Sequence, residues 1–255
     1  MNIHKAGDTR ETVSYCPVVE LRQYTLHPGQ RDVLVELFER AFIEAQETVG
    51  ATVIGQFRDL EDPNRFVWLR GFPDMDKRLA ALQAFYGGSV WQEHREAANA
   101  TLVDFDNVLL LRPARPTSGF FLDPSNRPPL GARELPPGLV VATILSFETP
   151  PSSDFLDLFE SALAPVLTKS GASILSSFVT EESANTFPAL PVREGEQVFV
   201  WFSGFRDQVA YDEYVDVLAR EEQWHDQIWE PLVRRHKAAP EVLKLAPTTR
   251  SLVQS

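Results

Sequence analysis

The spacing of apolar residues predicts helices and strands that alternate in a definite order. Residues 31–45 carry apolar side chains at helical spacing, which form one stripe that can be buried: Val33, Leu34, Leu37, Phe38, Ala41, Phe42 and Ala45. Residues 18–25, 51–58, 65–72 and 106–112 are short apolar or partly alternating runs typical of strands. A second helix is expected after Asp74, followed by a short helical segment around Trp91. The order β-α-β-β-α-β predicts a ferredoxin-like unit, an antiparallel sheet with helices on one face.

The same pattern returns in the second half of the chain. Residues 66–72 (FVWLRGF) recur as residues 199–205 (FVWFSGF), and Trp91 is echoed by Trp224. Strands are expected over 139–147, 173–179, 197–205 and 242–245, with helix starts at Ser153 or Asp154 and at Asp207. We therefore predict an α+β protein made of two tandem ferredoxin-like domains.

The predicted boundaries follow from composition. Residues 1–16 read as a flexible tail, 17–113 as the first domain, 114–138 as a linker and 139–255 as the second domain. The linker is rich in proline and should be extended. Its apolar run at Phe120, Phe121 and Leu122 is expected to dock on a domain surface. The second copy has a longer hairpin loop, residues 180–196, and loops of that length are often functional.

The open face of each sheet is expected to be covered by the other copy. In the third strand Val67 and Leu69 point to one side, while Trp68 and Arg70 point to the other. We expect the small aliphatic side chains to pack under the helices, which places the aromatic set on the open face. Two exposed aromatic faces would form a large apolar patch. Face-to-face packing of the two copies into a closed dimeric α+β barrel removes that patch.

The same alternation places charges between the two sheets. Glu20, Arg22 and Tyr24 share one side of the first strand, opposite Val19 and Leu21. Charges buried there need partners. One interpretation is a satisfied pair between Glu20 and an arginine that fixes the register. The other is a pocket inside the barrel, where Arg22 or Arg70 holds an anionic or carbonyl group against aromatic walls.

Charge and composition narrow the class of partner. The formal net charge is −12, which disfavours nucleic acid and anionic membrane surfaces. There is one cysteine, Cys16, no apolar run long enough to cross a bilayer and no secretory leader, so a cytoplasmic location is expected. No phosphate-binding glycine loop, serine nucleophile motif or histidine pair at metal-ligand spacing occurs, so we expect no cofactor and no metal. Assembly into a homo-oligomer stays open.

Residues 19–29 (VELRQYTLHPG) resemble the opening motif of NIPSNAP domains, a Glu-Leu-Arg-x-Tyr strand followed by a turn with Pro-Gly. The FVWL strand and the Trp91 region are also similar to that family, and the resemblance covers residues 18–112. The resemblance implies a dimeric α+β barrel fold. It implies no particular reaction, because NIPSNAP proteins as a class have none firmly assigned. The second copy lacks the motif, having VATIL at residues 141–145. Any site built on the motif is therefore expected once per chain.

Two functions from different classes remain open. The first is a pocket inside the barrel that binds, or converts without a cofactor, a small hydrophobic oxygenated molecule. Glu20, Arg22, Trp68 and Arg70 would bind this molecule, and Tyr24 or His94 would move a proton. The second is a non-catalytic scaffold whose barrel is filled by side chains. A space between the sheets that is packed solid, with Glu20 bidentate to an arginine, would contradict the first.

Overall fold

A computed structural model describes residues 14–221 and 237–255. In the first half the elements are β2 (Val18–Leu26), α1 (Arg31–Leu37), a π-helical turn (Phe38–Phe42), α2 (Ile43–Thr48), β3 (Thr52–Asp59), β4 (Arg65–Phe72), α3 (Met75–Gly87), α4 (Ser89–Asn99) and β5 (Leu102–Pro113). In the second half they are β7 (Leu139–Phe147), α5 (Ser153–Leu158), a π-helical turn (Phe159–Leu163), α6 (Ala164–Lys169), β8 (Ser173–Thr180), β9 (Gln197–Phe205), α7 (Gln208–Arg220) and β10 (Glu241–Pro247). The expected echo of Trp91 at Trp224 lies outside the described residues.

Local sequence explains where these elements begin and end. Asp74 and Asp207 accept hydrogen bonds from Lys77 N and Ala210 N, so each caps the helix that follows it. The cap of α5 is Ser152, one residue before the expected position. Gly50 and Gly171 follow the first long helix of each half with φ of +97° and +117°, a conformation that glycine adopts without steric cost.

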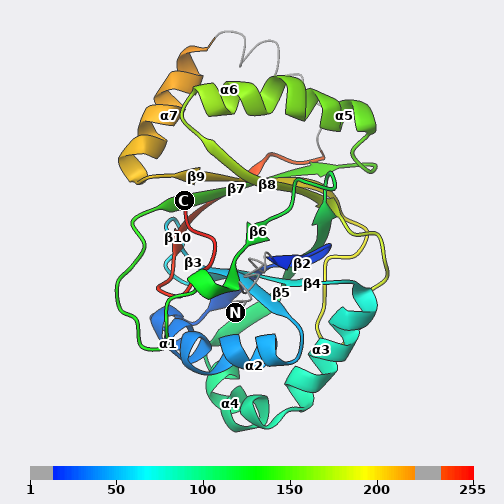
Figure 1. Cartoon of the computed structure of the whole chain (residues 1–255), viewed down its shortest axis with the longest axis vertical. Coiled ribbons are helices and arrows are strands. Elements are labelled where there is room, and N and C mark those ends of the chain that lie inside the picture. The colour runs from blue at the N-terminus through cyan, green and yellow to red at the C-terminus, as the bar shows by residue number, and fades with distance from the viewer. Residues whose placement is uncertain (1–13, 222–236) are drawn as a thin grey trace, which may run out of the picture.

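Eight strands form one closed antiparallel barrel in the order β10-β3-β4-β2-β5-β8-β9-β7. Strands of the first half are contiguous in this order, and so are those of the second. The halves join edge to edge, where β5 pairs with β8 and β10 pairs with β3. Figure 1 shows α1 to α4 on one side of the barrel and α5 to α7 on the other. Closure leaves no free edge on the barrel, which protects it from pairing with other chains.

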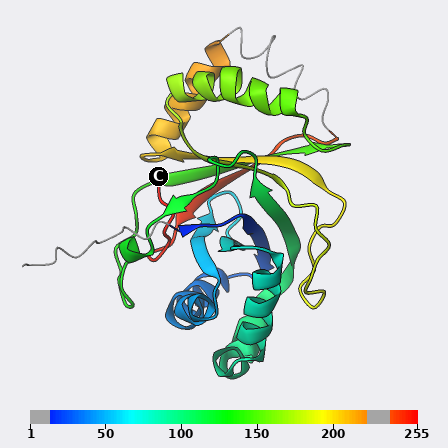
Figure 2. The same cartoon turned by 45° about the vertical axis from the view of Figure 1, so that its right-hand side comes forward.

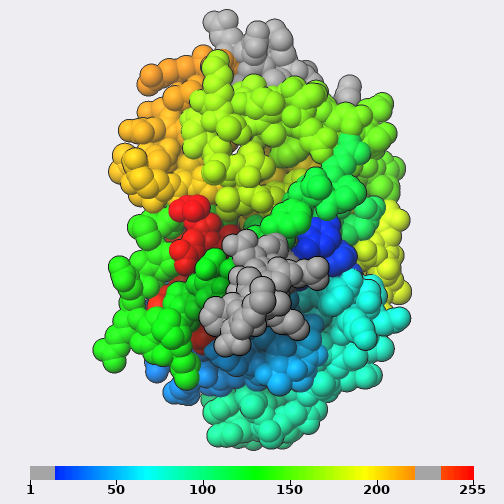
Figure 3. All heavy atoms as spheres, viewed as in Figure 1, coloured from blue at the N-terminus to red at the C-terminus, as the bar shows by residue number. Residues whose placement is uncertain are grey.

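The segments outside the barrel pack against it. Ser14–Tyr15 (β1) pairs with Phe121–Leu122 (β6), and Cys16 is buried, so these residues belong to the fold rather than to the expected flexible tail. Phe120 enters the barrel core beside Phe178 and Phe202, and Leu122 packs against the same core, as expected. Phe121 instead stays exposed and stacks on Tyr15. A short 3-10 helix, Pro124–Asn126, follows. The linker crosses the outside of the barrel between the two helical layers (Figures 2 and 3).

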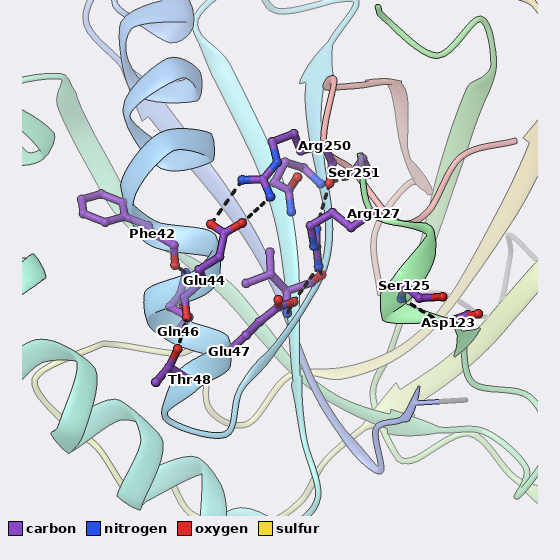
Figure 4. Close-up of polar contacts among 12 residues, drawn as sticks. Phe42, Glu44, Gln46, Glu47, Thr48, Asp123, Ser125, Arg127, Arg250 and Ser251 are labelled. Carbon is purple, nitrogen blue, oxygen red and sulfur yellow. Dashed lines mark hydrogen bonds and ion pairs between the residues drawn. The ribbon is translucent and has the colours of Figure 1, made fainter. Parts of the chain in front are cut away.

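Two arginines fasten the linker and the C-terminal segment to the first half (Figure 4). Arg250 pairs with Glu44 and donates hydrogen bonds to the carbonyl oxygens of Glu39 and Pro128, at 2.6 and 2.9 Å. Arg127 pairs with Glu47 at 2.6 Å and donates to the carbonyl oxygen of Arg250 at 2.8 Å. These contacts hold the connecting segment in place beside α2.

Candidate functional site

The expected orientation of the sheet is wrong in both halves. In the second half Phe199 and Trp201 pack under the helices, whereas Val200 and Phe202 face the barrel interior. In the first half Val19, Leu21, Val67 and Leu69 face the barrel interior, where they pack with side chains of the second half such as Phe202. The opposite side, with Tyr24, Phe66 and Trp68, packs under α1, α2 and α4. Glu20, Arg22, Trp68 and Arg70 therefore lie between the sheet and its helices. The predicted pocket inside the barrel is replaced by a filled apolar core.

Space and hydrogen-bond partners explain the reversal. The interior of an eight-stranded barrel is just wide enough for side chains to fill it, so aliphatic residues close it without voids. A charged side chain there would face mainly apolar groups and would cost several kcal/mol. The layer under the helices offers polar partners, because Gln46 on α2 and Arg78 on α3 both reach into it.

Glu20 is the centre of a buried ionic cluster. Its Oε2 accepts hydrogen bonds from Arg22 Nη1 and Arg70 Nε, and its Oε1 accepts one from Arg78 Nε, each at 2.7 Å. Glu20, Arg22 and Arg78 are fully buried, and the side chain of Arg70 is 1 % exposed. Each arginine also donates to a neutral acceptor: Tyr24 Oη, Gln46 Oε1 or Asn185 Oδ1. We call these four charged residues the Glu20 cluster.

The cluster keeps its groups ionised despite burial. Burial alone would raise the pKa of Glu20, but the guanidinium groups of Arg70, Arg22 and Arg78 hold that pKa well below its usual range. Burial would lower the pKa of Arg22, whereas Tyr24 and Glu20 beside it raise the pKa, and the net shift is upward. Burial lowers the pKa of Arg78 although Glu20 beside it opposes that shift. One carboxylate therefore faces three guanidinium groups, and arginine side chains stay protonated in proteins.

Tyr24 both contacts the Glu20 cluster and lines a cavity. Its hydroxyl oxygen accepts a hydrogen bond from Arg22 Nε at 2.9 Å. Burial raises the pKa of Tyr24 above its ordinary value although Arg22 opposes that shift, so the phenol stays protonated at neutral pH. The hydroxyl can then donate its own proton to a ligand while it accepts from Arg22. Tyr24 is thus suited to be a hydrogen-bond donor rather than a base.

A cavity of about 330 Å³ lies beside Tyr24 between the sheet and the helices. Its wall on the sheet side includes Tyr24 and Trp68, and its opposite walls come from the helices and from β5. Most of the lining is apolar or aromatic: Leu34, Phe38, Phe42, Phe85, Tyr86, Trp91, Ala98, Leu102 and Phe105, with Gln46 and Asn99 as polar members. An apolar cavity with a few polar groups is the usual form of a small-molecule site.

The π-helical turn at Phe38–Phe42 shapes this cavity. Both end residues line it, and their rings meet edge to face at 6.0 Å. A π-helical turn inserts an extra residue into a helix and often marks a functional site. Here it brings Phe38 against Trp68, at 4.8 Å between ring centroids, and leaves Phe42 against Trp91 and Phe85. The periodicity of residues 31–45 predicted one regular helix and gave no sign of the turn.

The second half of the chain completes the cavity. Phe187, Ala189 and Leu190 belong to the segment 181–196 between β8 and β9, and all three line the cavity. Phe187 stacks on Tyr86 with ring centroids 5.9 Å apart. Asn185 anchors the segment, since its Oδ1 accepts from Arg78 Nη1 at 3.1 Å. Figure 1 shows this segment descending from β8 and β9 beside α3. The loop singled out in the sequence therefore forms a wall of the cavity.

The structure separates the expected site residues. Tyr24 and Trp68 line the cavity, whereas Glu20, Arg22 and Arg70 lie behind its wall. His94 does not line the cavity. Its ring lies 6.2 Å from that of Phe42, and its Nε2 lies 3.9 Å from Glu93 Oε1 near the surface. His94 therefore lies apart from the cavity-lining residues, and its role in proton transfer stays a prediction.

Arg78 and Gln46 are the residues that the sequence interpretation missed. Arg78 precedes Leu82 by four positions and Phe85 by seven, so helical spacing places it on the buried face of α3. Gln46 follows Phe42 by four positions and is 2 % exposed. The available signal was the same for both residues: a charged or amide side chain stands at a position that helical spacing places on the buried face of its helix.

Residues 14–221 and 237–255 contain no group of three His, Cys, Asp or Glu side chains that could hold a metal ion. In the same segments, no helix is both long and apolar enough to cross a bilayer.

Comparison with known proteins gives one family and a set of similar folds. The family model described as NIPSNAP matches residues 19–115. No curated protein matches the sequence. A NIPSNAP-like domain protein from Burkholderia xenovorans shares 28 % sequence identity, with 44 % of this chain and 90 % of that chain covered and a TM-score of 0.36.

Two further solved structures are similar over nearly the full length. One is a proposed monooxygenase from Fusobacterium nucleatum, with a TM-score of 0.54, 8 % identity, and 94 % of this chain and 97 % of that chain covered. The other is an anthrone oxidase-like protein, with a TM-score of 0.50 and 14 % identity, and the alignment covers 93 % of this chain and 95 % of that chain. At these identities the similarity establishes the α+β barrel fold and nothing finer.

Proposed function

We propose that the chain binds a small hydrophobic oxygenated molecule in the cavity beneath the helices of its first half, where residues 19–115 match the NIPSNAP family model. The observation that carries the proposal is the position of Tyr24. Its side chain lines a cavity rich in aromatic rings, and its hydroxyl is oriented by a hydrogen bond from Arg22. An aromatic ligand would stack on the walls, and its oxygen would accept the Tyr24 proton.

Conversion of the bound molecule without a cofactor is part of the proposal. Two structural neighbours are described as a proposed monooxygenase and an anthrone oxidase-like protein, and this chain shares their fold. In this chain Tyr24 would hold a substrate oxygen and Trp68 would orient the ring beside it. The segment 181–196 would shield both from water.

We also propose that the halves are two copies of one ferredoxin-like unit, joined by the linker over residues 114–138. Matching strand registers support this division. Glu20 pairs across the sheet with Arg70, and Arg22 with Trp68. In the second half Val141 pairs with Ser203, and Thr143 with Trp201. The copies keep the tryptophan and differ at the charged positions, so only the first copy carries the Glu20 cluster.

Binding of 2-naphthol, followed by isothermal titration calorimetry, tests the proposed function. Ala189 lies at the cavity and is exposed, so Ala189→Trp should block the entrance without disturbing the core. Ala184→Trp is the matched control, because Ala184 is exposed in the same segment and lines a different depression. We expect Ala189→Trp to weaken binding at least about tenfold, or 1.4 kcal/mol, and Ala184→Trp to leave it unchanged.

The alternative is a scaffold without a ligand. The filled barrel interior favours it, because apolar side chains of both halves occupy the space where a pocket was first expected. Absence of 2-naphthol binding, or equal binding by both variants, would support the scaffold and contradict the proposed site.

A further inference from the structure

The Glu20 cluster carries more positive than negative charge. Three guanidinium groups surround one carboxylate, and no side chain of the cluster is more than 1 % exposed. The other groups bound to these arginines are neutral: the hydroxyls of Tyr24 and Thr186 and the amides of Gln46 and Asn185. Buried charge is retained where it is compensated by an opposite charge or has a function. The cluster therefore favours a further anion nearby.

The excess charge lies directly behind the cavity wall. The guanidinium carbon of Arg22 is 5.4 Å from the centre of the Tyr24 ring and 5.6 Å from that of Trp68. The guanidinium carbon of Arg70 is 5.1 Å from the Trp68 ring and 6.0 Å from the Tyr86 ring. Tyr24, Trp68 and Tyr86 all line the cavity. Two of the three cations are thus separated from the cavity by a single layer of aromatic rings.

Hydrogen-bond donors are also in excess here. Among the described residues, Nη2 of Arg22, Nη2 of Arg70 and Nε1 of Trp68 are buried without a hydrogen-bond partner. Tyr24 adds a hydroxyl that accepts from Arg22 and keeps its own proton for donation. An unsatisfied buried donor costs about 1–3 kcal/mol, and donors bind charged acceptors more strongly than neutral ones. Tyr24 and Trp68, which line the cavity, are therefore matched to an oxygen that bears negative charge, while the arginines behind them add attraction through their charge.

We propose that the ligand of this cavity is an aromatic anion, bound through a carboxylate, phenolate or enolate oxygen close to Tyr24 and Trp68. This inference rests on the proposed function and adds the charge of the ligand. The aromatic walls take the ring system, and the arginines behind them attract the ionised oxygen through a region of low dielectric constant. The second half of the chain offers no equivalent, since Val141, Thr143 and Ser203 stand where the first half has Glu20, Arg22 and Arg70.

Two probes of one shape test the charge preference. 2-Naphthoate and 2-naphthamide share the ring system and the carbonyl group, and only the former is an anion at pH 7. Isothermal titration calorimetry of the full chain should show that naphthoate binds at least about tenfold more tightly. The preference should persist at 0.5 M NaCl, because salt screens buried charges much less than exposed ones. Surface adsorption of the anion would disappear in the same salt.

Tyr24→Phe should reduce the preference by removing the donor that contacts the oxygen. Tyr214→Phe is the matched control, because Tyr214 lines a cavity of about 250 Å³ under α7 in the second half. It should leave the preference unchanged. Thermal unfolding of both variants establishes that each is folded at the titration temperature.

The outcomes separate the two proposals. Equal binding of naphthoate and naphthamide, or a preference that 0.5 M NaCl removes, overturns the inference and leaves the proposed function standing. Binding of neither probe contradicts the proposed function and the inference together. A naphthoate preference that survives salt and is reduced in Tyr24→Phe alone supports both.

Discussion

Glu20 is the residue whose environment differs most from that of an ordinary strand residue. It alternates with Val19 and Leu21, which face the barrel core, and it receives hydrogen bonds from three arginines on the other side. Those arginines come from β2, β4 and α3. One carboxylate therefore joins two strands and a helix at the base of the cavity.

Replacement of Glu20 by glutamine tests this role at the residue scale. Glu20→Gln keeps the size of the side chain and leaves three buried guanidinium groups without a counter-charge, so we expect a loss of about 3–5 kcal/mol of unfolding free energy at pH 7. The pKa of Glu20 is lowered by folding, so its stabilising effect is present above an unfolded pKa of about 4.3. The effect is lost as the pH falls toward the lower folded pKa.

The difference between the wild type and Glu20→Gln should therefore shrink by about 1.4 kcal/mol for each pH unit below about 4.3. Urea unfolding at pH 7, 4 and 3 measures this difference. Glu93→Gln is the control, because Glu93 is 74 % exposed. A constant difference across this range would show that folding does not lower the pKa of Glu20.

At the scale of elements, the segment 181–196 links the halves of the molecule through the site. It leaves the barrel between two strands of the second half and covers a cavity of the first. Asn185 accepts from Arg78 Nη1 and from Phe187 N, both at 3.1 Å, and donates to the Leu190 carbonyl at 2.9 Å. These three bonds hold the segment in the shape that places Phe187 and Leu190 on the cavity.

Asn185→Ala should therefore loosen the segment without unfolding the barrel. Loss of a buried hydrogen-bond partner costs about 1–3 kcal/mol, and a loop can open locally while the core stays closed. We expect faster amide hydrogen exchange over residues 181–196, weaker 2-naphthol binding and little change in the melting temperature. Ser183→Ala is the control, because Ser183 is exposed and bonds only Glu181 among the described residues. A large drop in melting temperature would instead make Asn185 part of the global core.

At the scale of the whole molecule, the barrel interior joins the halves into one cooperative unit. Its core draws buried side chains from strands of both halves, and Phe120 of the linker packs there against Phe202. The strand pairs β5–β8 and β10–β3 add backbone hydrogen bonds between the halves. Neither half would keep a closed core after separation.

Phe202→Ala tests this cooperativity. Phe202 is fully buried and contacts Phe120 and Phe178, so its truncation should cost about 3–5 kcal/mol. We expect one calorimetric unfolding transition in the wild type and one, shifted to lower temperature, in the variant. Val209→Ala is the control, because Val209 is 60 % exposed. Two transitions, with the first half unaffected, would show that the halves unfold independently.

The sequence by itself determined the elements and their order. Residues 65–72, 139–147 and 197–205 are strands with the expected bounds, and Asp74 and Asp207 cap the expected helices. Alternation also placed Glu20, Arg22 and Tyr24 on one side of β2 correctly. These features are local, since they depend on side-chain periodicity and on hydrogen bonds within a few residues.

Only the tertiary structure decided which side of the sheet faces the barrel. Alternation defines two faces but does not say which meets the helices, because both faces of this sheet are buried and both are rich in apolar residues. The choice depended on partners distant in sequence: Gln46, Arg78 and Asn185 for the charged face, and Phe120 and Phe202 for the aliphatic face. The cavity beside Tyr24 follows from that choice, since its walls come from both halves of the chain.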